Sequence, residues 1–150
     1  MIRKMIFVIV FLMVIISIAN GQQLNIRINA PRDKAIVSER PYAEGIVSDS
    51  NVKVWVIVHP MEVSDYWVQP RVTVKETGFW KVKINTGMPG DAGRQFKIMA
   101  VANPKDNLKE GDVLRGWPKA QAKSQVIEVI RKFGFNNEMQ PSRKRLHGGF

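Results

Sequence analysis

Two short stretches hold the side chains best suited to binding chemistry. Residues 59–70 carry Tyr66 and Trp67 beside Asp65 and Gln69. Large aromatic rings on a connecting segment can stack on a sugar ring or on a partner's side chain, while polar neighbours supply hydrogen bonds. The alternative is that the indole plugs one open end of the fold, because tryptophan is highly buried on average. The plug is the simpler interpretation, and both stay open at this point.

The second stretch, residues 103–123, holds Trp117 directly before Pro118. A connection of about twenty residues is long for an unstructured loop, so we expect a helical turn packed against a sheet edge. Trp117 either pins this insert down or joins Tyr66 and Trp67 in one aromatic patch. We expect any ligand contact where the two stretches meet. The candidate binding residues are Tyr66, Trp67, Gln69 and Trp117.

The chain offers little for catalysis or metal binding. Its two histidines are His59 and His147, and it has no cysteine, which excludes thiolate ligands and cysteine nucleophiles. The glycine-rich residues 87–93 lack the Lys-Ser/Thr of a phosphate-binding P-loop. No nucleophile-elbow motif accompanies a serine. We therefore expect a protein that is not an enzyme and needs no metal or cofactor. An uncharacterised hydrolase built from unmarked residues is the catalytic alternative.

The N-terminus has the layout of a secretory signal peptide. Arg3 and Lys4 precede an apolar run at residues 5–16, and small residues follow up to Ala19. The run is short of the ~20 residues that span a bilayer, so cleavage is favoured over an uncleaved anchor. The sequence predicts a signal peptide over residues 1–21 and an exported protein, periplasmic or extracellular. Membrane contact is expected only through an uncleaved signal segment.

The remainder of the chain alternates apolar and polar residues as β-strands do. The clearest segment is 51–59, where valines occupy every second position. Segments 71–75 and 79–84 flank a turn that ends in Gly78, which predicts a hairpin. Further strands are expected at residues 24–28, 42–47, 96–102 and 125–131. About seven strands and no amphipathic helix predict an all-β, two-sheet antiparallel sandwich with Greek-key connections.

The alternation also separates a core from a charged surface. The residues expected in the core are Val54, Val56, Trp80, Val82 and Ile98. The outward face of the predicted hairpin carries Arg71, Lys75, Lys81 and Lys83, with Lys53 and Lys97 as candidates to extend it. The formal net charge of the chain is +10. This basic face predicts weak, salt-dependent attraction for acidic polymers or anionic membrane surfaces, against the alternative of a solvated face with no partner.

Four short motifs follow one another along the chain: Ile28-Asn29-Ala30-Pro31, Gly45-Ile46-Val47, Thr77-Gly78-Phe79-Trp80 and the run from Ser124 to Val129. In this order they resemble bacterial immunoglobulin-like or fibronectin-III-like extracellular modules, over roughly residues 24–131. The chain departs from antibody-type domains because it lacks their cysteine pair and inserts residues 103–123 before the last strand. The resemblance implies an immunoglobulin-like sandwich and an extracellular setting, and it carries over no catalytic residue.

These inferences divide the chain into a signal peptide (1–21), an immunoglobulin-like β-sandwich (22–132) and a basic tail (133–150) that we expect to be disordered. The expected function is a secreted or periplasmic, non-enzymatic binding or assembly module that contacts envelope proteins. One alternative is a carbohydrate-binding module that uses the loop aromatics, and another is a small enzyme. The expected partner is an envelope protein or a polysaccharide, and the positive charge favours an acidic one. No specific nucleic acid is expected.

Overall fold

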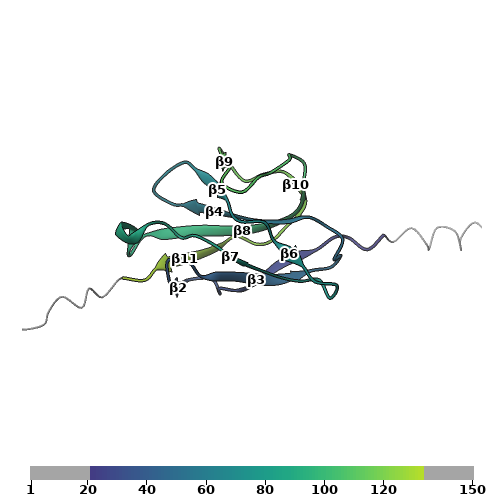
Figure 1. The fold of residues 1–150 in the computed structure, drawn as a ribbon, viewed down its shortest axis with the longest axis horizontal. Helices are drawn as coiled ribbons and strands as arrows, with labels where there is room; N and C mark the ends of the chain where they lie inside the picture. Colours follow the sequence, from purple (N-terminus) through teal and green to yellow (C-terminus); the bar gives the residue numbers. More distant parts are fainter. Residues whose placement is uncertain (1–20, 134–150) are drawn as a thin grey trace, which may run out of the picture.

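The computed structural model describes residues 21–133, which fold into two packed β-sheets (Figure 1). Its elements are β1 (Ile26–Ala30), β2 (Ala35–Val37), β3 (Tyr42–Val47), β4 (Val54–Pro60), β5 (Tyr66–Val68), β6 (Thr73–Val74), β7 (Phe79–Lys83), the 3₁₀ turn η1 (Pro89–Asp91), β8 (Gln95–Pro104), β9 (Val113–Leu114), β10 (Ala120–Lys123) and β11 (Ile127–Arg131). The all-β prediction is confirmed. Most of the predicted signal peptide and of the tail lies outside the described residues. Within them, no helix is both long and apolar enough to cross a membrane.

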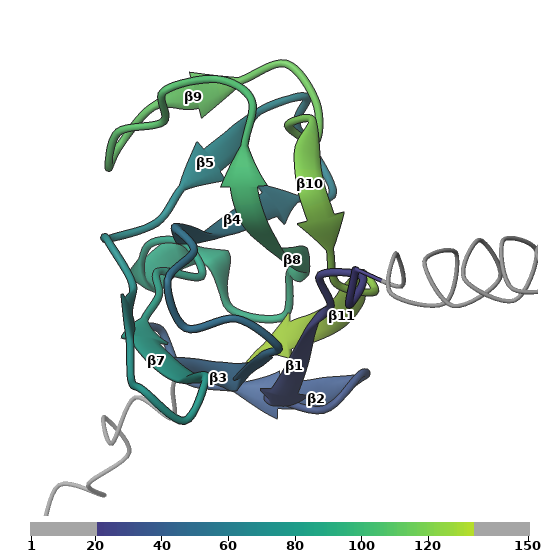
Figure 2. The same ribbon diagram turned by 90° about the vertical axis from the view of Figure 1, so that its right-hand side faces the viewer.

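The first sheet has the order β1-β3-β7-β6, and the second has the order β2-β11-β8-β4-β5-β9, with β10 beside β8. All pairs are antiparallel except β2 with β11. Viewed along the molecule, β7, β3 and β1 lie across from β4 and β8 (Figure 2). The predicted two-sheet, mostly antiparallel arrangement is therefore confirmed.

The space between the sheets is filled by the alternating apolar faces. Val54, Val56 and Val58 of β4 are buried there, as alternation along a central strand requires. Every residue expected in the core is buried: Val54, Val56, Trp80, Val82 and Ile98. The predicted hairpin is formed by β6 and β7, and Gly78 takes a φ of 80° in its turn, a conformation that favours glycine.

Trp80 lies at the centre of this core with none of its surface exposed. Gly45 of β3 is its cross-strand neighbour. A Cβ atom at position 45 would lie 2.5 Å from Cζ2 of the indole, so only glycine leaves room for the ring. Among the described residues the indole Nε1 has no hydrogen-bond partner, so Trp80 contributes to the core through packing.

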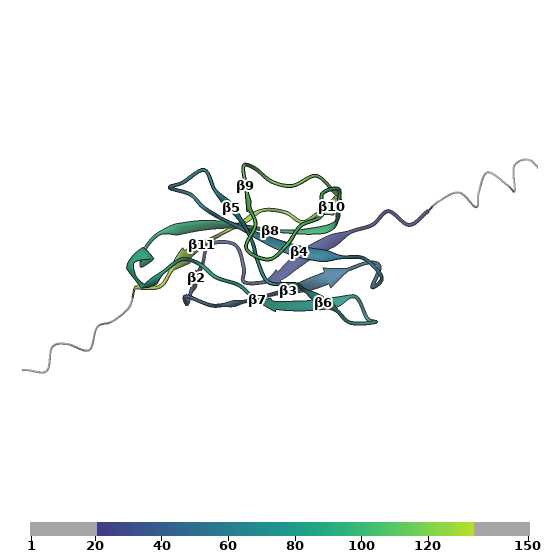
Figure 3. The ribbon, with the colours of Figure 1, turned by 45° about the horizontal axis from the view of Figure 1, so that its top comes forward.

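The insert at residues 103–123 differs in part from the prediction. It contains the two short strands β9 and β10 and no helix. β9 adds to the edge of the second sheet at β5, as predicted, and the insert also covers the outer face of that sheet (Figure 3). The insert covers this outer face because the face is apolar. Ile57, Met99 and Val101 are apolar on this outer face, and Leu108 of the insert covers them in a second core. A face of this composition must be kept from water.

The charged side chain of Arg131 is buried and links three segments of the sandwich. The Arg131 side chain is 7% exposed, donates from Nη1 to the Thr86 carbonyl oxygen at 2.9 Å, and pairs through Nη2 with Glu39 Oε2 at 3.0 Å. Buried guanidinium groups are stable only when they are hydrogen-bonded in this way. Arg131 therefore ties the last strand to the segments that follow β2 and β7.

Candidate binding surfaces

Tyr66 and Trp67 project to opposite faces of the second sheet. Both belong to β5, and successive residues of a strand alternate between faces. Trp67 pairs with Val58, a residue of the central core, whereas Tyr66 packs against the second core on the outer face. Trp117 belongs to that outer face too. The single aromatic patch considered from the sequence is therefore not formed.

On the outer face, Tyr66 and Trp117 form a cluster with His59. The His59 and Tyr66 rings stack with centroids 4.0 Å apart, and Trp117 meets Tyr66 edge-on at 4.8 Å. His59 Nδ1 donates to the backbone oxygen of Asp65 at 2.9 Å, and Arg115 pairs with the Asp65 carboxylate at 3.3 Å. The rings of His59, Tyr66 and Trp117 therefore pack against one another. They support the interpretation that Trp117 pins the insert to the sheet.

Trp67 lines an open pocket on the other face. The pocket has a volume of about 450 Å³ and lies where residues 60–70 meet Glu110 and Gly111 of the insert, in the region expected to make a ligand contact. Its apolar lining includes Val63 and Met88, which are 47% and 74% exposed, while Trp67 is 42% exposed. Its other lining residues are Arg40, Val58, Pro60, Val68, Gln69, Pro70, Asn85, Gly87, Asp91, Arg94, Phe96, Glu110 and Gly111.

Gln69 lines this pocket, and both the nitrogen and the oxygen of its side-chain amide form hydrogen bonds within the protein. The side chain is buried, its Nε2 donates to the Trp67 carbonyl oxygen at 3.2 Å, and its Oε1 accepts from the Asn85 amide at 2.8 Å. These bonds join the end of β5 to the segment after β7. Gln69 is therefore a positioning residue for Trp67. Sequence reasoning also missed Met88, which enters the pocket from a distant turn.

The predicted basic face exists on the outer surface of the first sheet. Its members Arg71, Lys75, Lys81 and Lys83 are all exposed. Lys81 Nζ lies 4.6 Å from the centroid of the Tyr42 ring and 3.2 Å from Glu44 Oε2. Part of its positive charge is therefore compensated by neighbours on the same face. Lys97 does not extend this face, because it belongs to the outer surface of the second sheet. Lys53 lines one groove together with Arg71.

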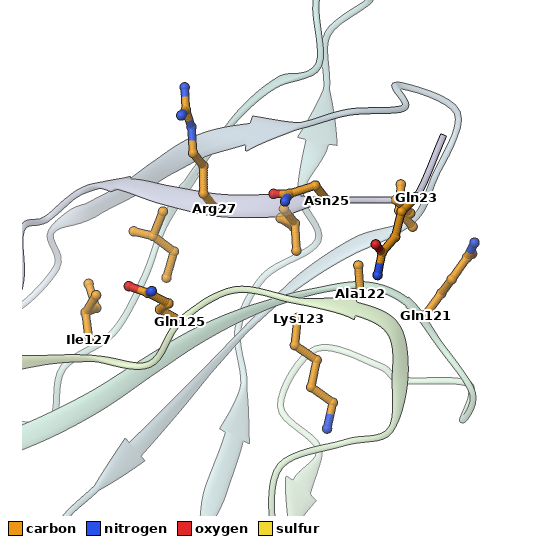
Figure 4. A pocket seen from close by; sticks show the side chains of 11 residues that line it. Gln23, Asn25, Arg27, Gln121, Ala122, Lys123, Gln125 and Ile127 are labelled. Carbon is orange, nitrogen blue, oxygen red and sulfur yellow. The ribbon is translucent and has the colours of Figure 1, made fainter. Parts of the chain in front are cut away.

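A groove with a volume of about 700 Å³ separates β1 from β10 and the start of β11. Figure 4 shows the amides of Gln23, Asn25 and Gln125 between these strands, whereas Arg27 and Lys123 point away. Amides donate and accept hydrogen bonds equally, so this lining selects no ligand class.

Among residues 21–133, no group of three or more His, Asp or Glu side chains is placed to hold a metal ion. The chain matches no protein-family model, and no curated protein matches it.

Proposed function

We propose that this protein is an exported, non-enzymatic binding or assembly module. It binds an envelope protein at the pocket lined by Trp67, Val63 and Met88, the Trp67 pocket. The observation that carries the proposal is the convergence of exposed Trp67, Val63 and Met88 on one concave site. Single exposed apolar residues are ordinary, but a cluster that lines a hollow is typical of a contact site. Export rests on the signal-like N-terminus.

An immunoglobulin-like fold is part of the proposal, and the strand order supports it. The order β1-β3-β7-β6 corresponds to strands A, B, E and D of such a domain, and β11-β8-β4 to G, F and C. Two features depart from antibody domains: the chain has no cysteine pair, and its buried Trp80 lies on β7, in the place of strand E. The fold supplies a rigid frame whose connecting segments carry recognition.

The pocket suits an apolar anchor side chain of a partner. Its volume falls in the ~300–1,000 Å³ range of small binding sites. Around the apolar centre the rim is charged, with Arg94 paired to Asp91 at 2.7 Å and to Glu62 at 3.1 Å. An apolar centre inside a polar rim is the usual anatomy of a protein interface. Trp67 would contribute a large, stiff contact surface at low entropic cost.

Site-specific photo-crosslinking tests the proposal. A photo-reactive amino acid replaces Met88 in the full chain, produced in its own cells, and the cross-linked species are identified by mass spectrometry. We expect one dominant partner, whose yield falls at least about tenfold in Trp67→Ala, the loss typical of a binding hot spot. The matched control is Ile36→Ala, which removes an apolar side chain that is 70% exposed and lies outside the pocket. Equal yields from both variants would contradict the proposal.

The structure lacks the aromatic arrangement that would favour the carbohydrate-binding alternative. Exposure of Trp67 and Trp117 side by side would favour it, and the two residues lie on opposite faces of the sheet. A flat stacking platform for sugar rings cannot be built from that pair. We therefore do not propose it as a second function.

A further inference from the structure

A second groove runs along the side of the sandwich. Its volume is about 950 Å³, and three segments line it: residues 50–55 around the start of β4, residues 71–74 around β6, and residues 104–109 of the insert. None of its lining residues lines the Trp67 pocket. The groove is therefore a separate site, and nothing inferred from it depends on the function proposed above.

The charge of this groove is strongly biased. Lys53, Arg71, Lys105 and Lys109 line it from all three segments, and every one of them is exposed. Asp106 is the single acidic residue of the lining. Within the described part of the chain, none of the four cations forms an ion pair with a carboxylate. Four cations gathered in a hollow raise the local concentration of anionic groups.

Open strand edges face the same groove. β6 pairs only with β7, so its other edge has no strand beside it in the described structure. β4 pairs with β5 only at Ile57 and Val58, which leaves Val54 beyond the end of β5.

The direction of the free backbone groups follows from alternation. The Val56 carbonyl accepts from the Gln69 amide, on the β5 side of β4. Val54, two residues earlier in the same strand, therefore directs its backbone groups to that side as well. An edge of this kind is a template for pairing with another extended chain.

We infer that the groove binds an acidic, extended peptide segment of a partner protein, which adds as a strand along the open edge of β4. Strand addition uses main-chain hydrogen bonds for affinity and alternate side chains for specificity. Carboxylates on the peptide would meet Lys53, Lys105 and Lys109, while the apolar side chains on its other face would lie toward Val72, which also lines the groove. An anionic polysaccharide would satisfy the cations but would leave the strand edge unused.

The test uses the purified full chain and three synthetic probes. The first is an eight-residue peptide of alternating Glu and Val with blocked ends. The second is the same peptide with every second backbone nitrogen methylated, which removes the donors needed for strand pairing. The third is heparin, a polysaccharide polyanion. Binding is measured by calorimetry at two salt concentrations. We expect the unmodified peptide to bind most tightly, the methylated peptide to lose at least about tenfold in affinity, and added salt to weaken both.

Charge reversal locates the site. Lys53→Glu combined with Lys105→Glu should weaken peptide binding about tenfold or more, as expected for lost charge complementarity in a groove. The matched control, Lys81→Glu with Lys83→Glu, makes the same change of net charge on the outer surface of the first sheet and should change the affinity less than about threefold. Trp67→Ala should have no effect on this peptide. The inference is overturned if methylation makes no difference, if heparin alone binds, or if the two charge reversals act equally.

Discussion

Gly45→Ala is a single-methyl change that the structure predicts to be severe. The new Cβ would lie 2.5 Å from the Trp80 ring and closer still to the Arg27 carbonyl oxygen. Neither neighbour can retreat easily. The indole is fully buried among core side chains, and the carbonyl belongs to β1, which is paired with β3 in register. Gly45 has no positive φ, so the effect isolates steric crowding.

The magnitude follows from these contacts. Overpacking a well-filled core costs about 1–3 kcal/mol, and two rigid neighbours place Gly45→Ala at the upper end, near 3 kcal/mol. Such a loss is a large fraction of the ~5–15 kcal/mol that stabilises a typical domain. For a domain of this size, the thermal midpoint should fall by about 10 °C. Thermal and urea denaturation followed by circular dichroism measure the change in the free energy of unfolding.

The chain provides a matched control. Gly116 lies in the insert without a positive φ, and an added Cβ there meets nothing within 4 Å. Gly116→Ala should be neutral or stabilising by up to about 1 kcal/mol, because alanine restricts the unfolded chain. The reasoning is refuted if Gly45→Ala and Gly116→Ala unfold at the same midpoint, since the contact with Trp80 would then carry no cost.

Four further predictions follow from the same structure. Trp80→Ala should lower the free energy of unfolding by about 3–5 kcal/mol in urea titrations, and an unchanged midpoint would remove it from the core. Arg131→Met should cost about 2 kcal/mol, because it leaves the buried carbonyl oxygen it now satisfies without a partner; a double variant that also removes Glu39 should recover little. Trp117→Ala should expose the insert to limited proteolysis before the sandwich unfolds, since the half-buried indole holds it to the second core; simultaneous cleavage throughout would contradict this. Lys81→Glu with Lys83→Glu should elute from heparin at lower salt than the unaltered chain, and unchanged elution would place the attraction elsewhere, the groove cations being the first alternative.

Much of the fold could be predicted from local sequence. The valines of β4, the turn at Gly78 and the outward lysines of β7 follow from a period of two, which each strand expresses by itself. The core position of Trp80 follows from the same alternation. Because one face of such a strand must be buried, its inward side chains can be identified before any partner strand is known.

The candidate sites could not be read in the same way. β5 has three residues, too few to show a period, so Tyr66 and Trp67 look like members of one loop until the pairing with β4 sends them to opposite faces. The path of the insert likewise depends on the apolar outer face of β4 and β8, which only the folded sheet presents. Short strands such as β9 and β10 form where a longer strand offers them an edge.

The pocket and the basic groove depend entirely on tertiary structure. Trp67, Met88 and Phe96 line one pocket from separate segments that local sequence does not place relative to one another. The groove likewise gathers Lys53, Arg71 and Lys105 from three segments. The types of these side chains were visible in the sequence, as was the positive charge that dominates the chain. Their convergence was not, because it is set by sheet packing and strand pairing between residues far apart in the chain. Alternation along each strand determined which side chains face inward, and only the packing of the two sheets decided which of the others meet.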